Sequence, residues 1–121
     1  MMAKIMIVDD AMFMRQMLRN IIIDMNFEEI CEAKSGLEAI QLYGEQRPDI
    51  VTMDITMPDM DGYTAVKEII KLYPDAKIIM CSAVGQQRMI LNSIMAGAKD
   101  FIVKPFDKKR VIDSLTKVLN K

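Results

Sequence analysis

Short apolar stretches alternate along the chain with longer amphipathic ones. Three of the short stretches are near-continuous runs of Ile, Val, Met and Cys, which is typical of parallel strands buried on both faces. The longer stretches repeat apolar residues at the i, i+3/i+4, i+7 spacing of a helix with one buried face. The pattern predicts five strands, each followed by a helix. The predicted strands cover residues 4–8, 28–33, 49–53, 77–81 and 100–103, and the helical stripes begin at Phe13, Leu37, Ala65, Met89 and Val111.

Turn residues fall where this pattern changes. Ser35-Gly36 and Asp61-Gly62 precede helices, while Pro48 and Pro74 come just past helices that they cannot continue. Five βα units in strict alternation predict an α/β fold, with an open parallel sheet covered by helices on both faces. We expect a single three-layer domain over residues 1–121, with the flavodoxin-like strand order 2-1-3-4-5.

Composition excludes several classes of protein. The chain has 121 residues, of which 51% are apolar and 27% charged, as in an ordinary globular domain. A net charge of −1 gives no support for binding nucleic acid or an anionic membrane. The N-terminus does not read as a signal peptide, and no stretch reaches the ~18 apolar residues that span a bilayer. We therefore expect a cytoplasmic protein.

Cysteine and histidine usage restricts the chemistry further. Cys31 and Cys81 lie in apolar strand-like runs, where a free Cys behaves as a small hydrophobic residue. The sequence contains no His, so it lacks the commonest general base and the commonest soft metal ligand. Any metal site must use oxygen ligands, which favours Mg²⁺, Mn²⁺ or Ca²⁺.

Polar residues follow the predicted strands at the edge where ligands bind in such sheets. Asp9 and Asp10 follow the first strand, Asp54 the third, Ser82 the fourth and Lys104 the fifth. Each alone would be an ordinary turn or surface residue. Together, three carboxylates repel one another unless a hard cation and the Lys104 ammonium neutralise them. Such a site suits a phosphoryl group, and Asp54 on the central strand is the expected nucleophile that accepts it.

Several longer segments resemble a known family. The segments 8–10, 53–62, 82–83, 97–101 and 104–106 together make the chain similar to response-regulator receiver domains over its whole length. Segments 10–15 and 81–87 resemble most the stand-alone chemotaxis regulators of that family. The resemblance implies a phosphoacceptor signalling protein and not an enzyme.

The same resemblance assigns roles to individual residues. It implies Mg²⁺, or Mn²⁺ in its place, bound by Asp10, Asp54 and the backbone carbonyl of Thr56, with Asp9 assisting through water. It implies that Ser82 and Lys104 bind the phosphoryl group, and that Ser82 and Phe101 form a switch pair in which Phe101 turns inward on phosphorylation. The face built by the fourth helix, fifth strand and fifth helix would then change. Its expected residues are Met89, Ile90, Lys99, Phe101 and Lys108.

The implied partners are proteins. A chemotaxis histidine kinase would donate the phosphoryl group; since the sequence has no His, a phosphohistidine donor must belong to another protein. A flagellar switch protein or an archaeal motility adaptor would receive the signal. Val84 cannot hydrogen-bond an attacking water, so we expect slow self-dephosphorylation assisted by a separate phosphatase. We expect no output domain after the last predicted helix, which would suit a diffusing monomer. We interpret the basic residues of the last third, Arg110 included, as mainly solvated charges.

Four alternatives stay open at this point. The first is a stand-alone receiver in a phosphorelay or another two-component pathway. The second is a haloacid-dehalogenase-type phosphohydrolase, but that class places its nucleophile after the first strand with a second Asp two residues on, where this chain has Thr56 after Asp54. A flavin-binding electron carrier lacks support because no Ser/Thr/Gly-rich loop follows the first strand. A DNA-binding transcription regulator is disfavoured by the net charge.

Overall fold

The computed structural model describes residues 3–120 and contains one parallel sheet in the order β2-β1-β3-β4-β5, as predicted. The strands match the predicted ones to within one residue at each end. One difference affects the site, because Asp54 and Ser82 are the last residues of their strands and not the first residues beyond them. The strands are β1 (Lys4–Val8), β2 (Glu29–Ala33), β3 (Ile50–Asp54), β4 (Ile78–Ser82) and β5 (Asp100–Val103).

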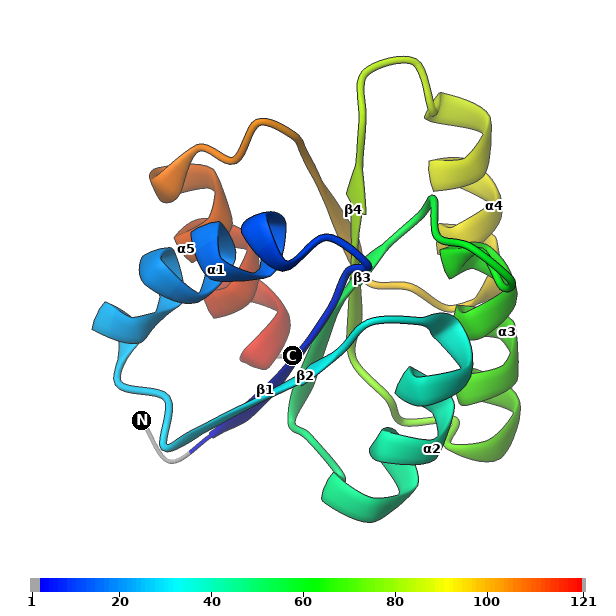
Figure 1. Ribbon diagram of the computed structural model, residues 1–121, viewed down its shortest axis with the longest axis horizontal. Helices are drawn as coiled ribbons and strands as arrows, with labels where there is room; N and C mark the ends of the chain where they lie inside the picture. Colours follow the sequence, from blue (N-terminus) through cyan, green and yellow to red (C-terminus); the bar gives the residue numbers. More distant parts are fainter. Residues whose placement is uncertain (1–2, 121) are drawn as a thin grey trace.

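Helices cover both faces of the sheet, which confirms the three-layer prediction. Figure 1 shows α1 and α5 on one face and α2, α3 and α4 on the other. Among the described residues no helix is both long and apolar enough to cross a bilayer. The helices are α1 (Met12–Ile22), extended by a 3-10 turn η1 (Ile23–Met25), α2 (Gly36–Gln46), α3 (Gly62–Leu72), α4 (Gln87–Ala96) and α5 (Lys108–Leu119).

The sheet divides the core into two layers of apolar side chains. Along β1, Ile5 and Ile7 face α1 and α5, whereas Met6 and Val8 face α2 and α3, as the period of a strand requires. Burying one such side chain contributes about 1.5–3 kcal/mol relative to leaving it exposed. The two layers bury the central strands on both faces, so the residues at their carboxyl ends are held close to one another.

Side-chain caps fix where three of the helices begin. Ser35 accepts a hydrogen bond from the Glu38 amide at 3.1 Å, and Asp61 accepts one from the Thr64 amide at 2.7 Å. Asp107 does the same for α5 at 3.0 Å. Each satisfies an amide that has no partner within the helix. The helices α1 and α4 begin without a side-chain cap.

Both cysteines are free thiols in the sheet, as the structural interpretation expects. Burial raises the pKa of the Cys81 thiol well above its usual range and also raises that of the half-buried Cys31. A thiol that stays protonated is a poor nucleophile and metal ligand. The expectations for Met1, Met2 and Lys121, and with them the outer limits of the domain, lie outside the described residues.

Candidate functional site

Three carboxylates meet at the carboxyl edge of the sheet, as the strand ends predict. Asp9 follows β1, and its amide donates to the Ala33 carbonyl of β2 at 3.1 Å, which continues the strand pairing and fixes the turn. Asp54 ends β3 and is only 6% exposed, whereas Asp10 is exposed. One oxygen from each of the three carboxylates lies within 4.8 Å of the others.

An ammonium group joins these acids from the residue after β5, the outer strand next to β4. The Lys104 Nζ lies 2.9 Å from Asp9 Oδ2 and 2.9 Å from Asp54 Oδ1. Its backbone amide donates to the Ser82 carbonyl at 2.7 Å, so the residue is held at the end of β5. The Lys104-Pro105 peptide bond is cis. The site therefore draws charged groups from β1, β3 and β5, up to 95 positions apart in the sequence.

Burial and crowding change the proton affinity of the two central groups. Burial raises the pKa of the Asp54 carboxyl, and the nearby Asp9 and Asp10 charges raise it further, outweighing the Lys104 hydrogen bond. Burial would lower the pKa of Lys104, but its hydrogen bonds to Asp54 and Asp9 outweigh burial, so that pKa is raised. Lys104 is therefore a firmly charged ammonium, while the ionised Asp54 is held at a cost in free energy.

Ser82 and Thr56 complete the rim of the site. Ser82 ends β4, one strand from Asp54 in the sheet, and its buried hydroxyl has no hydrogen-bond partner among the described residues. A buried hydroxyl left unpaired costs free energy and points to a ligand or a movement that would satisfy it. Thr56 lies in the loop after β3 with its side chain exposed and its hydroxyl accepting a hydrogen bond from Gln86.

Two contacts around the acids were not predicted from the sequence. Arg15 of α1 donates to the Asp9 carbonyl at 2.7 Å and to the Glu32 carboxylate at 2.8 Å, so it anchors the turn that carries the acid pair. Gly62 begins α3 directly against the Asp54 carbonyl, where a Cβ atom would clash. The sequence marks Gly62 only as a helix start, and it gives no sign that Arg15 turns toward the site.

The residues predicted for the output face do not all lie on one exposed surface. Phe101 is 36% exposed on β5, so it is not packed in the core, and Ile90 lies beside it in a shared apolar hollow. Lys99 is exposed, but Met89 is half-buried and packs against the core beneath α4. Lys108 is exposed and faces Asp24 of η1 at 3.6 Å, on the side of α5 nearest α1.

Arg110 is paired within the protein and is not the solvated charge that we expected from the sequence. Its guanidinium donates to the Phe101 carbonyl at 2.6 Å and to the buried Asp100 carboxylate at 3.3 Å. Ser114 also donates to Asp100, at 2.6 Å, and Lys117 lies 3.2 Å away. Burial alone would raise the pKa of Asp100, but these partners hold it well below its usual range. The network fixes α5 against β5 below Phe101.

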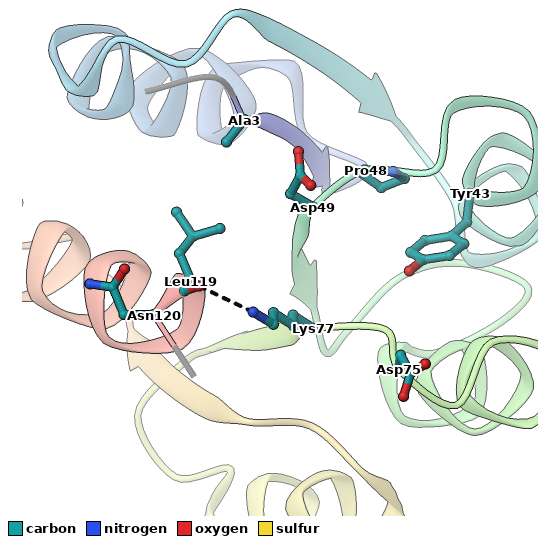
Figure 2. Close-up of a pocket in the computed structure, with 8 residues that line it drawn as sticks. All are labelled: Ala3, Tyr43, Pro48, Asp49, Asp75, Lys77, Leu119 and Asn120. Carbon is teal, nitrogen blue, oxygen red and sulfur yellow. Dashed lines mark hydrogen bonds between the residues drawn. The ribbon is translucent and has the colours of Figure 1, made fainter.

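Two hollows differ in what they can bind. The one drawn in Figure 2 has a volume of about 430 Å³ and lies at the amino end of the sheet, opposite the end that carries Asp54. Within it, the Asp49 carboxylate accepts a hydrogen bond from the Lys4 amide, and the Lys77 ammonium donates one to the Leu119 carbonyl. Two of its charged residues, Asp49 and Lys77, are thus engaged by the protein itself. The other, about 360 Å³, is nearly all apolar and is bordered by the β4–α4 loop, Ile90, Phe101 and Val103.

The acid cluster fits a hard divalent cation. Oxygen donors are the ligands that Mg²⁺ prefers, and it commonly takes one or two carboxylates together with waters and a phosphate oxygen. Three carboxylate oxygens within 4.8 Å of one another supply such a set, and Lys104 offsets only part of their charge. The donors present therefore suit Mg²⁺ and do not suit a thiophilic metal.

The chain belongs to the response regulator receiver domain family, whose match covers residues 5–116. Two curated relatives bear the name chemotaxis protein CheY. The protein from Listeria monocytogenes is 58% identical over 96% of this chain and 98% of its own length, and that from Bacillus subtilis is 56% identical over 97% and 98%. The chain is thus a signalling protein of the chemotaxis response-regulator type and not an enzyme of the ordinary kind.

A solved structure agrees with this assignment. A CheX–CheY–BeF3–Mg²⁺ complex from Borrelia burgdorferi contains a chain that matches with a TM-score of 0.92 and 38% identity, over 98% of this chain and 90% of that one. The predicted flavodoxin-like, receiver-type fold is therefore confirmed. The relatives cover the chain almost end to end, so the comparison applies to the whole described domain.

Proposed function

We propose that this protein is a cytoplasmic, monomeric messenger of chemotaxis that accepts a phosphoryl group on Asp54. The observation that carries the proposal is the meeting of the Asp54 carboxylate with the Lys104 ammonium, 2.9 Å away, and with the carboxylates of Asp9 and Asp10. Asp54 and Asp9 are both nearly buried and both contact Lys104, but Asp54 ends the central strand β3, whereas Asp9 lies at the turn after β1.

The transfer is a displacement at phosphorus. An Asp54 carboxylate oxygen forms a new P–O bond while the P–N bond to a phosphohistidine of the donor kinase breaks, and the electron pair returns to the imidazole nitrogen. Lys104 would pair with a phosphoryl oxygen, and a second oxygen would satisfy the Ser82 hydroxyl, which has no partner in the described part of the chain. The protein's share of the work is positioning and charge stabilisation.

The acid cluster would hold Mg²⁺ through Asp10, Asp54 and the Thr56 carbonyl, with Asp9 assisting. When bound, the ion supplies positive charge that neutralises the acids and the incoming phosphoryl oxygens. Val84, an apolar side chain 82% exposed near the site, cannot orient a hydrolytic water. This supports a slow loss of the phosphoryl group and the use of a separate phosphatase.

The output is a change in protein binding. The apolar hollow between the β4–α4 loop and Phe101 gives the partly exposed ring a space to enter. A flagellar switch protein or an archaeal motility adaptor would bind the face that includes Ile90 and Phe101. The family assignment and the CheY names of the curated relatives support this partner class.

The first test is phosphorylation by acetyl phosphate, a small phosphodonor, with Mg²⁺ and with EDTA. We expect the intact mass to rise by one phosphoryl group only with Mg²⁺, and the Asp54→Asn variant to gain nothing. Asp113→Asn is the matched control, since its exposed carboxylate pairs with Lys109 on α5, away from the site. Equal labelling of the Asp54→Asn variant would refute the assignment of the acceptor.

The second test is binding to motility proteins from the same genome, with and without beryllofluoride and Mg²⁺. We expect beryllofluoride to strengthen binding to a motor or adaptor protein, and Asp54→Asn to abolish the increase. Strengthened binding only to a histidine phosphotransfer protein would favour the phosphorelay alternative and overturn the motility assignment.

A further inference from the structure

The side chain of Gln86 bridges the two loops that border the site. Its Oε1 accepts a hydrogen bond from the Ala83 amide at 2.7 Å, and its Nε2 donates to Thr56 Oγ1 at 2.7 Å. Ala83 directly follows Ser82, and Thr56 lies two residues after Asp54. One neutral amide thus ties the β4–α4 loop to the β3–α3 loop across 30 positions of sequence.

Gln86 also stands at the start of α4. Helix-capping positions usually hold Ser, Thr, Asp or Asn, whose side chains bond the first free amides. Gln86 makes no such bond, because its amide is used by the two loops. Its carbonyl accepts the hydrogen bond from Ile90, at 3.0 Å, that begins the helix. A displacement of Gln86 therefore moves the first turn of α4, where Ile90 borders the apolar hollow.

These contacts oppose the movement that Ser82 needs. Its buried hydroxyl has no hydrogen-bond partner within residues 3–120, and we expect the chain after β4 to shift when that hydroxyl reaches a phosphoryl group on Asp54. We propose that Gln86 is a positioning residue that latches the β4–α4 loop to Thr56 and must be released before Ser82 can bind the phosphoryl group. The inference rests on the function proposed above and adds a residue that sets how easily the site switches.

The strength of the latch follows from its two hydrogen bonds. Both join neutral groups in a partly exposed setting, where such bonds contribute modestly to stability. Together they bias the loop toward the latched position by about 5- to 30-fold. Removing them should tighten binding of a phosphoryl mimic by a similar factor. A variant that merely damaged the fold would bind the mimic more weakly, so the direction of the change is informative.

The test measures the affinity for beryllofluoride with Mg²⁺, and the rate of labelling by acetyl phosphate, in a double-mutant cycle. Gln86→Leu removes both bonds, and Thr56→Val removes the hydroxyl while keeping the backbone carbonyl. We expect Gln86→Leu to bind beryllofluoride about fivefold or more tightly and to be labelled faster. Adding Thr56→Val to it should change little further, because contacting residues act non-additively. Gln87→Leu is the matched control, since Gln87 borders the same hollow and its side chain makes no hydrogen bond within residues 3–120.

Several results would overturn the latch. They are an unchanged or weaker affinity in Gln86→Leu, effects of the two substitutions that simply add, or an equal gain in Gln87→Leu. Slower phosphoryl loss with unchanged affinity would instead assign Gln86 to orienting the hydrolytic water. The proposed function fails in a different way: wild-type protein would not bind beryllofluoride, or Asp54→Asn would bind it equally well.

Discussion

Replacing Asp54 by Asn should stabilise the fold in buffer without magnesium. The folded-state pKa of Asp54 lies above its ordinary value, chiefly through burial and then through the charges of Asp9 and Asp10. A carboxyl of this kind binds its proton more tightly in the folded state, so its ionisation costs folding free energy. That cost is fully present at neutral pH and disappears as the pH falls below the ordinary carboxyl range, near about 4.

Two opposing contributions set the size of the effect. Asn removes a buried charge and its repulsion from two neighbouring acids, but it gives the Lys104 ammonium a neutral amide oxygen as acceptor in place of a carboxylate, which costs about 1 kcal/mol. The raised pKa means that the first contribution is the larger. We expect the free energy of unfolding to increase by about 0.5–2 kcal/mol, the common range for a single stabilising substitution.

Urea unfolding with EDTA at pH 7 tests this expectation. The chain has no Trp, so far-UV circular dichroism is the suitable signal. Asp113→Asn, which removes an exposed charge, should change stability by less than about 0.5 kcal/mol. Mg²⁺ at about a hundredfold its Kd should then add about 2.7 kcal/mol to the wild type and less to the Asp54 variant. An Asp54→Asn variant less stable than the wild type in EDTA would refute the reasoning.

Three further predictions concern the supports of the site. Asp100→Asn should lower the free energy of unfolding at pH 7 by about 1.5–3 kcal/mol, because Ser114 and two cations lose a charged partner. The pKa of Asp100 is lowered in the folded state, so this loss of stability, measured by urea unfolding, should shrink as the pH falls below about 4. Gly62→Ala should cost about 1–3 kcal/mol in urea unfolding, because its Cβ would displace the backbone at Asp54. Arg15→Met should weaken Mg²⁺ binding by about tenfold or more in a titration, with unfolding as the control for a general loss of structure.

The sequence predicts the parts of the site that depend on strand ends. Asp54 and Lys104 could be placed together because carboxyl ends of parallel strands share one edge, and apolar runs locate those ends within a residue. The order of the strands came from an expectation for a domain of this size. Contacts made by long side chains could not be found this way. Arg15 and Gln86 each have several rotamers, and only the packed loops select the one that reaches Asp9 or Thr56.

The hydrogen bond from Arg110 to the Phe101 carbonyl bears on how copies of this protein meet. β5 is an outer strand of the sheet, and outer strands expose backbone groups that can pair with a strand from another chain. The Phe101 carbonyl already accepts from a guanidinium at 2.6 Å, so it is less available to an incoming strand. The contact therefore works against extension of the sheet at β5, while the Phe101 ring beside it stays accessible to partners that bind through side chains.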